Sequence, residues 1–341
     1  MHSSRRPALT RRIVLGGAAA LPLVAIRTKP ADAAQFTLKV ATGQSLGQPI
    51  NTRLGAACKR IEATTGGRVK IGFFPASQLG SDTDLLTQVR SGGVDFLNIA
   101  ASVTSTVAPA IGIANVGFAF KSYDQVWPAI DGALGKVSRA AVAKSGMLIV
   151  SRAGNNELRQ ISSFSKPIVT PADLKGYRIR VPVSPIFTSM FTTLGANPTS
   201  INFNELYSAL QTHLVDGQEN GLVTIDAGKL YEVQKYVSMT NHIWDPFWLL
   251  GNPRSFNSLP DDIKTVMVKE FDAAYLGQRE DVVTMEKTLR QTLTSKGLTF
   301  HDVDSAPFKA ALANGGYYKD WKAKFGAADW KALEEAAGGL G

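Results

Sequence analysis

The chain has 341 residues, which is enough for two domains with cores of their own, and its 37 Lys and Arg residues outnumber its 28 Asp and Glu residues. The formal net charge of +9 first favours an acidic partner. Six of the basic residues fall within the first 33 positions, however, and the others are scattered. The sequence therefore predicts no nucleic-acid partner.

Residues 1–33 have the pattern of a cleaved export signal. A basic start precedes an apolar run from Ile13 to Ile26 and the small residues of Ala31-Asp32-Ala33. Thr10-Arg11-Arg12 indicates the twin-arginine route, with an ordinary Sec signal as the alternative. Either route predicts a periplasmic protein. Losing the six basic residues and Asp32 lowers the net charge from +9 to +4.

The first half of the remaining chain alternates strand and helix patterns. Strands are predicted at residues 36–41, 68–75, 94–100 and 147–151, and helices at 52–65, after Ser81, and through 137–143, each ending at glycine. This alternation predicts a parallel sheet with helices on both faces. Cys58, the only cysteine, falls on the apolar face of the first helix, which indicates a buried structural thiol.

The turn after the first predicted strand, Gly43-Gln44-Ser45-Leu46-Gly47, matches the G-x-S-x-G pattern of a nucleophilic serine. Ser45 could use His242 or His301 as its base, so a periplasmic serine hydrolase is one hypothesis. The motif sits at the very start of the sheet, however, whereas a nucleophile elbow normally follows several strands. We therefore interpret the turn as a binding element in a protein that is not an enzyme.

A second α/β series begins near Arg159. It includes a short helix after Thr170-Pro171, the strand "YRIRVP", helices at 187–194 and 204–211, and the strand and turn "VDGQENGLVTI". Two such series predict two lobes with a cleft between them. A helical pattern from Pro260 to Gly297 is long enough to lie along both lobes. The tail, with Trp321 and Trp330, reads as docked amphipathic helix.

Arg180 is the last regular residue of "YRIRVP" before Pro182. It therefore lies at the carboxyl end of its strand, which is where open α/β sheets bind ligands. A guanidinium there can hold a carboxylate through two parallel hydrogen bonds. The alternative is a surface arginine at a strand end.

The sequence offers no pattern for a metal or a nucleotide cofactor. The four histidines are far apart, no H-E-x-x-H or C-x-x-C occurs, and neither glycine-rich phosphate loop is present. We expect no metal and no cofactor.

Four segments together resemble the solute-binding subunits of TRAP (tripartite ATP-independent periplasmic) transporters of the DctP type: "GGRVKIGFFPASQLGSDTDLLTQVRSGGVDF", "ADLKGYRIRVP", "LGANPTSINFNELYSALQTHLVDGQENGL" and "YEVQKYVSMTNHI". The similarity runs in order through about residues 36–335. It implies an α/β, two-lobed periplasmic-binding-protein-like fold with a long helix spanning both lobes. The expected lobes are 34–157 plus about 246–285, and 158–245 plus about 286–341.

In that family the arginine of "RVP" pairs with the substrate carboxylate, which implies this role for Arg180. The resemblance also implies that Asn220 and Arg159 support the carboxylate and that Phe203 packs on the ligand. Each has a plainer alternative. Asn220 could serve a turn, Arg159 could form an ion pair between the lobes, and Phe203 could belong to the core.

From the first lobe, the resemblance implies that Gln44, Ser45 and Asp82 face the cleft. The alternative for Asp82 is a carboxylate that only stabilises a helix N-terminus. Gly43 and Ala100 are small where the sialic-acid-binding branch has polar or acidic groups, which disfavours a heavily hydroxylated sugar acid.

The resemblance implies delivery of a small carboxylate to the integral membrane subunits of a TRAP transporter, by a protein expected to be a monomer. The alternative within binding proteins is a receptor for an ABC-type or tricarboxylate-type importer. Trp244, Phe247 and Trp248 lie near the second crossover between the lobes. If one of them faces the cleft, an apolar or aromatic carboxylate becomes attractive.

Overall fold

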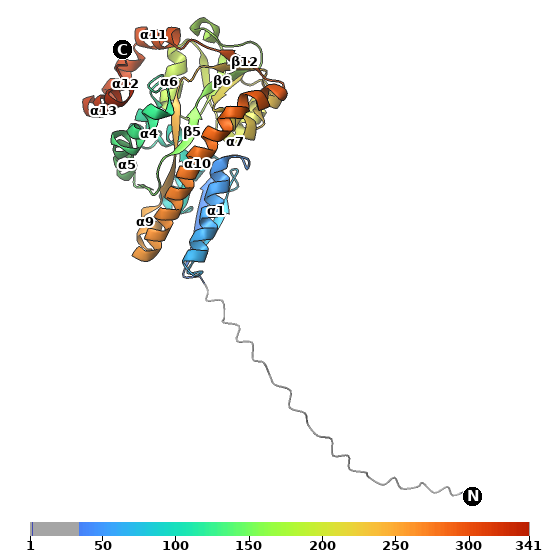
Figure 1. Ribbon diagram of the computed structural model, residues 1–341, viewed down its shortest axis with the longest axis vertical. Helices are drawn as coiled ribbons and strands as arrows, with labels where there is room; N and C mark the ends of the chain where they lie inside the picture. The colour runs from blue at the N-terminus through green and yellow to red at the C-terminus, as the bar shows by residue number, and fades with distance from the viewer. Residues whose placement is uncertain (1, 3–33, 341) are drawn as a thin grey trace. The chain divides into compact units, whose positions relative to one another are not determined.

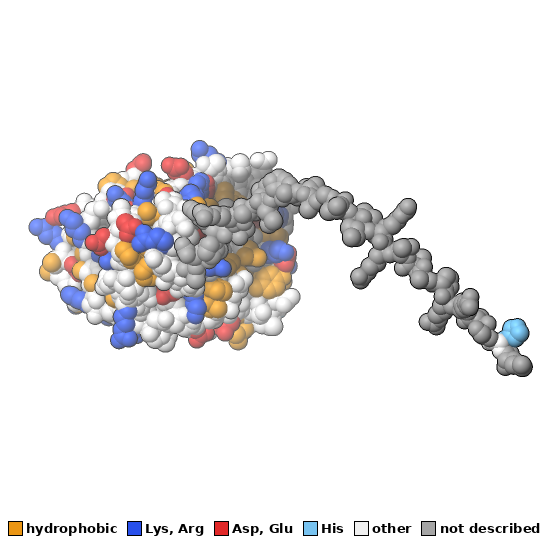
Figure 2. Space-filling view, turned by 90° about the horizontal axis from the view of Figure 1, so that it is seen from below, with side chains coloured by type: hydrophobic (Ala, Val, Ile, Leu, Met, Phe, Trp, Pro, Cys, Tyr) orange, Lys and Arg blue, Asp and Glu red, His pale blue; other side chains and the backbone are white. Residues whose placement is uncertain are grey.

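The computed structural model describes residue 2 and residues 34–340. The predicted export signal and its twin-arginine motif lie outside the described residues. Within them, no helix has both the length and the apolar character that crossing a membrane requires. Lys and Arg side chains are interspersed with Asp and Glu over the face drawn in Figure 2.

Two six-stranded sheets form the framework (Figure 1). The first has the order β2-β1-β3-β11-β4, with β5 also paired to β11, and its strands are β1 (Phe36–Thr42), β2 (Val69–Phe74), β3 (Phe96–Ala100), β4 (Leu148–Ile149), β5 (Gly154–Leu158) and β11 (Trp244–Gly251). The second has the order β12-β10-β6-β9-β7-β8, and its strands are β6 (Gln160–Ser163), β7 (Arg178–Val181), β8 (Asn197–Ser200), β9 (Gly217–Asn220), β10 (Tyr236–Met239) and β12 (Thr299–Asp302).

The helices cover these sheets and connect their strands. They are α1 (Pro49–Thr64), α2 (Asp82–Ser91), α3 (Ala101–Thr104), α4 (Tyr123–Asp131), α5 (Ala133–Lys144), α6 (Pro185–Thr193), α7 (Phe203–Gln211), α8 (Leu222–Ala227), α9 (Pro253–Asn257), α10 (Asp261–Ser295), α11 (Ala306–Asn314), α12 (Tyr317–Phe325) and α13 (Ala327–Ala337), with 3-10 turns η1 (Pro109–Asn115), η2 (Pro171–Leu174) and η3 (Leu230–Glu232). The α/β class and the long helix are confirmed.

Three local predictions were wrong. The first sheet is not all parallel, because β11 returns from the second sheet and pairs antiparallel with β3, β4 and β5. The predicted strand 147–151 is reduced to two residues. The segment "VDGQENGLVTI", predicted as strand and turn, forms β9 and then the helix α8. A short apolar segment is compatible with either strand direction and with either strand or helix. Its pairing in the folded protein therefore decides which structure it forms.

The long helix α10, which runs alongside α1 in Figure 1, contributes to two separate cores. Its first half lies beside α1 and packs Met267 and Phe271 against the first sheet. Its last turns pack Leu289 and Leu293 with α7 and α8. At its middle, Gln278 accepts from the backbone N–H of Asn155 (2.8 Å) and donates to the carbonyl of the same residue (2.8 Å), which fixes β5 to the helix.

The chain crosses between the sheets at two adjacent points. One crossover passes through Arg159, between β5 and β6, and the other through residues 240–243, between β10 and β11. They are hydrogen-bonded to each other, from the Arg159 N–H to the Ile243 carbonyl (2.8 Å) and from the His242 N–H to the Arg159 carbonyl (3.3 Å). The predicted lobe boundaries stay a prediction. Helix α13, which was assigned with the second lobe, contacts α4 and α5.

Gly221 provides a test of the crossover packing. The Glu157 carboxylate accepts from the N–H groups of Val223 (2.9 Å) and Thr224 (3.3 Å) at the start of α8. A Cβ on Gly221 would lie 2.2 Å from its carboxyl carbon. We expect Gly221→Ala to lower the free energy of unfolding by about 1–3 kcal/mol in a urea titration. The control Gly339→Ala meets no atom within 4 Å, and equal midpoints for the two variants would contradict this packing.

Candidate ligand-binding site

A narrow cavity of about 30 Å³ lies between elements of the two sheets. Gln44, Asp82, Ala100, Ser102, Val103 and Asp245 line it from the first sheet and its helices. Asn156 lines it from β5 and Arg159 from the first crossover. From the second sheet and α7, the lining residues are Arg180, Pro182, Phe203 and Asn220. The cavity thus brings together six of the seven predicted site residues, which come from distant parts of the sequence.

Arg180 is a buried guanidinium with no ion pair among residues 34–340. Its Nε (2.9 Å) and one terminal nitrogen (2.7 Å) donate to the carbonyl of Ile201, which fixes the plane of the group. Burial lowers the pKa of Arg180 to about 10, although the nearby carboxylates of Glu219 and Asp82 favour the charged form. The side chain is therefore a fixed cation at the cavity wall.

Arg159 lines the same cavity, but a carboxylate of the protein already holds it. Its Nε donates to Glu219 Oε2 (2.5 Å), and a terminal nitrogen donates to Glu219 Oε1 (2.9 Å) and to Asn220 Oδ1 (2.7 Å). Arg159 is therefore in an ion pair, as the plainer hypothesis proposed, although Glu219 belongs to the same predicted lobe. Asn220 both lines the cavity and orients Arg159.

His242 completes this cluster from the second crossover. Its Nε2 lies 3.1 Å from Glu219 Oε2 and its Nδ1 lies 2.7 Å from the Thr240 hydroxyl. Burial lowers the pKa of His242 despite the charge of Glu219. Burial alone would raise the pKa of Glu219, but Arg159 and His242 outweigh it and hold that pKa below its usual range. The Arg159–Glu219 pair thus keeps its charges beside a neutral imidazole.

Asp82 begins α2 and packs against the turn after β1. Ser81 and Asp84 form the capping box of this helix, so Asp82 does not cap it. A Cβ on Gly43 would lie only 2.0 Å from Asp82 Oδ1, which explains why glycine occupies that position. Burial raises the pKa of Asp82 to about 6, and Arg180 opposes the shift. The carboxylate accepts no hydrogen bond from a described residue.

Asp245 is a cavity residue that the sequence did not reveal. It accepts from the hydroxyl (2.7 Å) and N–H (3.2 Å) of Ser102 and from the side-chain amide of Asn115 (2.9 Å). Burial raises the pKa of Asp245, with Arg159 and these donors opposing the shift. In the segment "NHIWDPFWLL" the conspicuous residues are aromatic, and no known motif includes the aspartate.

The three aromatic residues of that segment do not line the cavity. Trp244, Phe247 and Trp248 are each 1% exposed, and all belong to hydrophobic cores. Trp244 donates from its ring nitrogen to Asn155 Oδ1 (2.9 Å). None of the three therefore faces the cleft, which was the condition for favouring an apolar or aromatic carboxylate.

Gln44, Phe203 and Ser45 differ in their placement. Gln44 lines the cavity, and Phe203 both lines it and packs against the core around α7. Ser45 is not among the lining residues, and its backbone carbonyl accepts from the Asn51 amide (2.8 Å). The described residues hold no cluster of His, Cys, Asp and Glu that could bind a metal ion.

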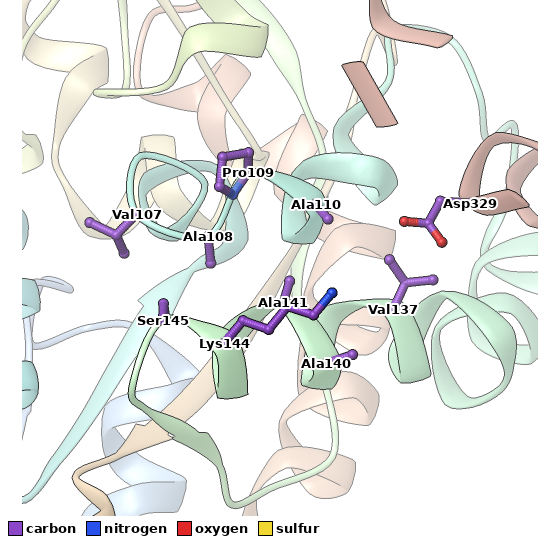
Figure 3. A pocket seen from close by; sticks show the side chains of 10 residues that line it. All are labelled: Val107, Ala108, Pro109, Ala110, Val137, Ala140, Ala141, Lys144, Ser145 and Asp329. Atoms are coloured by element: carbon purple, nitrogen blue, oxygen red, sulfur yellow. The ribbon is translucent and has the colours of Figure 1, made fainter. Parts of the chain in front are cut away.

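A larger hollow of about 310 Å³ lies elsewhere, between η1, α5 and α13 (Figure 3). Figure 3 shows mostly small apolar side chains such as Ala108 and Val137, with Lys144 and Asp329 as its charged groups. It contains none of the predicted site residues, so the narrow cavity is the candidate site.

The chain is similar to known proteins both in sequence and in fold. Residues 40–322 match the model of the DctP family, described as bacterial extracellular solute-binding protein, family 7. The chain is 28% identical over 306 residues to the sialic acid-binding periplasmic protein SiaP of Vibrio cholerae, covering 89% of this chain and 94% of that protein. It is also 29% identical to the uncharacterized protein y4mM of Sinorhizobium fredii, over 90% of this chain but only 57% of that longer protein.

The fold resembles a solved TRAP periplasmic solute-binding protein from Polaromonas sp. JS666, bound to D-erythronate. The TM-score is 0.83 at 27% identity, covering 88% of this chain and 98% of that one.

The raised pKa of Asp82 predicts that the stability of the folded protein depends on pH. Because its folded pKa is raised to about 6, its ionisation destabilises the ligand-free protein as the pH rises through that value. We expect Asp82→Asn to raise the free energy of unfolding by about 1–3 kcal/mol at pH 7.5 and by almost nothing at pH 4. Urea titrations at the two pH values measure this difference. An equal effect at both pH values would show that ionising the buried carboxylate does not destabilise the protein.

Proposed function

The chain belongs to the DctP family of bacterial extracellular solute-binding proteins, and we propose that it captures a small hydroxylated monocarboxylate and delivers it to a TRAP-type secondary transporter. The observation that carries this proposal is Arg180. A guanidinium that is 2% exposed and forms no ion pair with a described residue is suited to a carboxylate ligand. Its Ile201 contacts hold it in place for a two-pronged interaction.

The other polar groups of the cavity favour a ligand with hydroxyl groups. Asp82 is an acceptor without a hydrogen-bond donor among the described residues, and Gln44 lines the same wall. A ligand hydroxyl supplies the donor that a buried carboxylate requires. Because no aromatic residue of the second crossover lines the cavity, we propose a short hydroxy acid rather than an aromatic one. D-erythronate, the ligand of the Polaromonas protein, is a suitable probe.

We further propose that residues 1–33 export the protein to the periplasm by the twin-arginine route and that it works as a monomer of two lobes. Support for export comes from the order of basic, apolar and small residues at the start of the chain. The two sheets, joined by two crossovers and α10, support a hinged pair of lobes.

Catalysis by Ser45 has no support in the site. Its hydroxyl makes no hydrogen bond with a histidine of residues 34–340, and His242 lies 1% exposed between Glu219 and Thr240. A serine nucleophile requires a base within hydrogen-bond reach. We therefore propose that the protein binds its ligand without changing it.

The arginine assignment has a matched control on the same strand. Arg180→Ala is expected to weaken D-erythronate binding by about 2–5 kcal/mol, much of it from leaving the carboxylate buried and unpaired. Arg178 is exposed and pairs with Asp216 (2.6 Å), so Arg178→Ala should leave the affinity within twofold. Isothermal titration calorimetry measures both. Near-native affinity in Arg180→Ala would contradict the proposal.

The absence of serine chemistry can be checked directly. A fluorophosphonate probe is expected to leave the protein unlabelled under conditions that label a serine hydrolase. Labelling that disappears in Ser45→Ala would instead establish the hydrolase hypothesis.

A further inference from the structure

The charges around the cavity do not balance. Arg159 and Arg180 face Asp82, Glu219 and Asp245, all of them buried. Glu219 holds Arg159 directly, and Asp245 lies 3.8 Å from the same guanidinium. When all five groups are ionised, the cluster carries one negative charge more than positive before any ligand is added.

Among the three carboxylates of this cluster, the ionised form of Asp82 receives the least stabilisation from the protein. Glu219 is held by Arg159 and His242, and Asp245 accepts from Ser102, Asn115 and Asn156. Asp82 has only the charge of Arg180 in its favour, and its carboxylate lies against the backbone of Gly43. It is therefore the carboxylate most easily neutralised by a proton.

A ligand carboxylate on Arg180 removes that remaining support. It brings a second negative charge close to Asp82, in a cavity of about 30 Å³ that both Arg180 and Asp82 line. Two carboxylates close together in a small cavity resist being ionised at the same time, even with one cation nearby. Arg159 does not add a second unpaired charge, since Glu219 already pairs with its Nε and one terminal nitrogen, and Asn220 accepts from that same nitrogen.

We propose, on the basis of the carboxylate function argued above, that the site selects ligands carrying one negative charge and that Asp82 takes up one proton from solvent when such a ligand binds. The protonated Asp82 can then donate a hydrogen bond to a ligand oxygen. A dicarboxylate brings a second negative charge to a cavity wall that offers no second unpaired cation among the described residues.

The sign of the pH dependence follows from this coupling. Free Asp82 has a pKa of about 6, so above that pH each binding event takes up close to one proton. The dissociation constant of a monocarboxylate should therefore rise by about tenfold per pH unit between pH 7 and 8, and it should level off below about pH 6. Burial also raises the pKa of Glu157 to about 8. Glu157 does not line the cavity, and its titration remains in Asp82→Asn, so the variant separates the two carboxylates.

Calorimetry with two four-carbon acids tests the proposal. D-erythronate and succinate are titrated into the purified protein at pH 7.5 in phosphate and in Tris, because the difference in heat between the buffers gives the protons taken up. We expect close to one proton with D-erythronate and at least about a hundredfold weaker binding of succinate. For Asp82→Asn we expect close to zero protons, a flat pH profile, and a gap between the two acids that is at least tenfold smaller.

Asp124→Asn is the matched control. Asp124 is exposed, lies in the first turn of α4 and does not line the cavity, so this variant should behave like the wild type. D-erythronate binding without proton uptake, or succinate binding equal to it in the wild type, would overturn this inference and leave the proposed function standing. If neither acid binds to the wild type or to Asp82→Asn, both are overturned.

Discussion

A guanidinium that has left water needs an anion close to it, and this requirement at Arg180 organises the site. Within the described residues its direct partner is the carbonyl of Ile201, while Glu219 is committed to Arg159. A fixed cation of this kind suits a carboxylate that arrives and leaves, because the protein itself does not neutralise it. Arg159 shows the contrasting case, since its charge is matched by the protein and serves to hold the two crossovers in place.

The scaffold brings these groups together from distant parts of the chain. Arg180 comes from β7, Asp82 from the start of α2, and Asp245 from the strand that returns to the first sheet. The cavity lies where strands of both sheets end, and the hydrogen-bonded crossovers at Arg159 and His242 lie beside it. Helix α10 fixes β5 through Gln278 and packs into a core on either side of that point. A movement of one sheet relative to the other would therefore change the distances between the residues that line the cavity.

Much of the framework could be predicted from sequence, because glycine ends, capping residues and apolar periodicity are local signals. The long helix, the capping box at Ser81 and the buried Cys58 followed from such patterns. The antiparallel return of β11 could not be predicted, since an apolar strand pairs equally well in either direction. The importance of Arg180 could be inferred from its position at a strand end, whereas no local pattern pointed to Asp245. Its role depends on Ser102 and Asn115, which lie more than a hundred residues away in sequence.

The central claim is that Arg180 holds the carboxylate of the ligand. The most direct measurement is a crystal structure of the protein grown with D-erythronate. The account predicts both carboxylate oxygens within hydrogen-bonding distance of the Arg180 guanidinium, with a ligand hydroxyl beside Asp82. A carboxylate bound elsewhere, with Arg180 still contacting only Ile201, would contradict it.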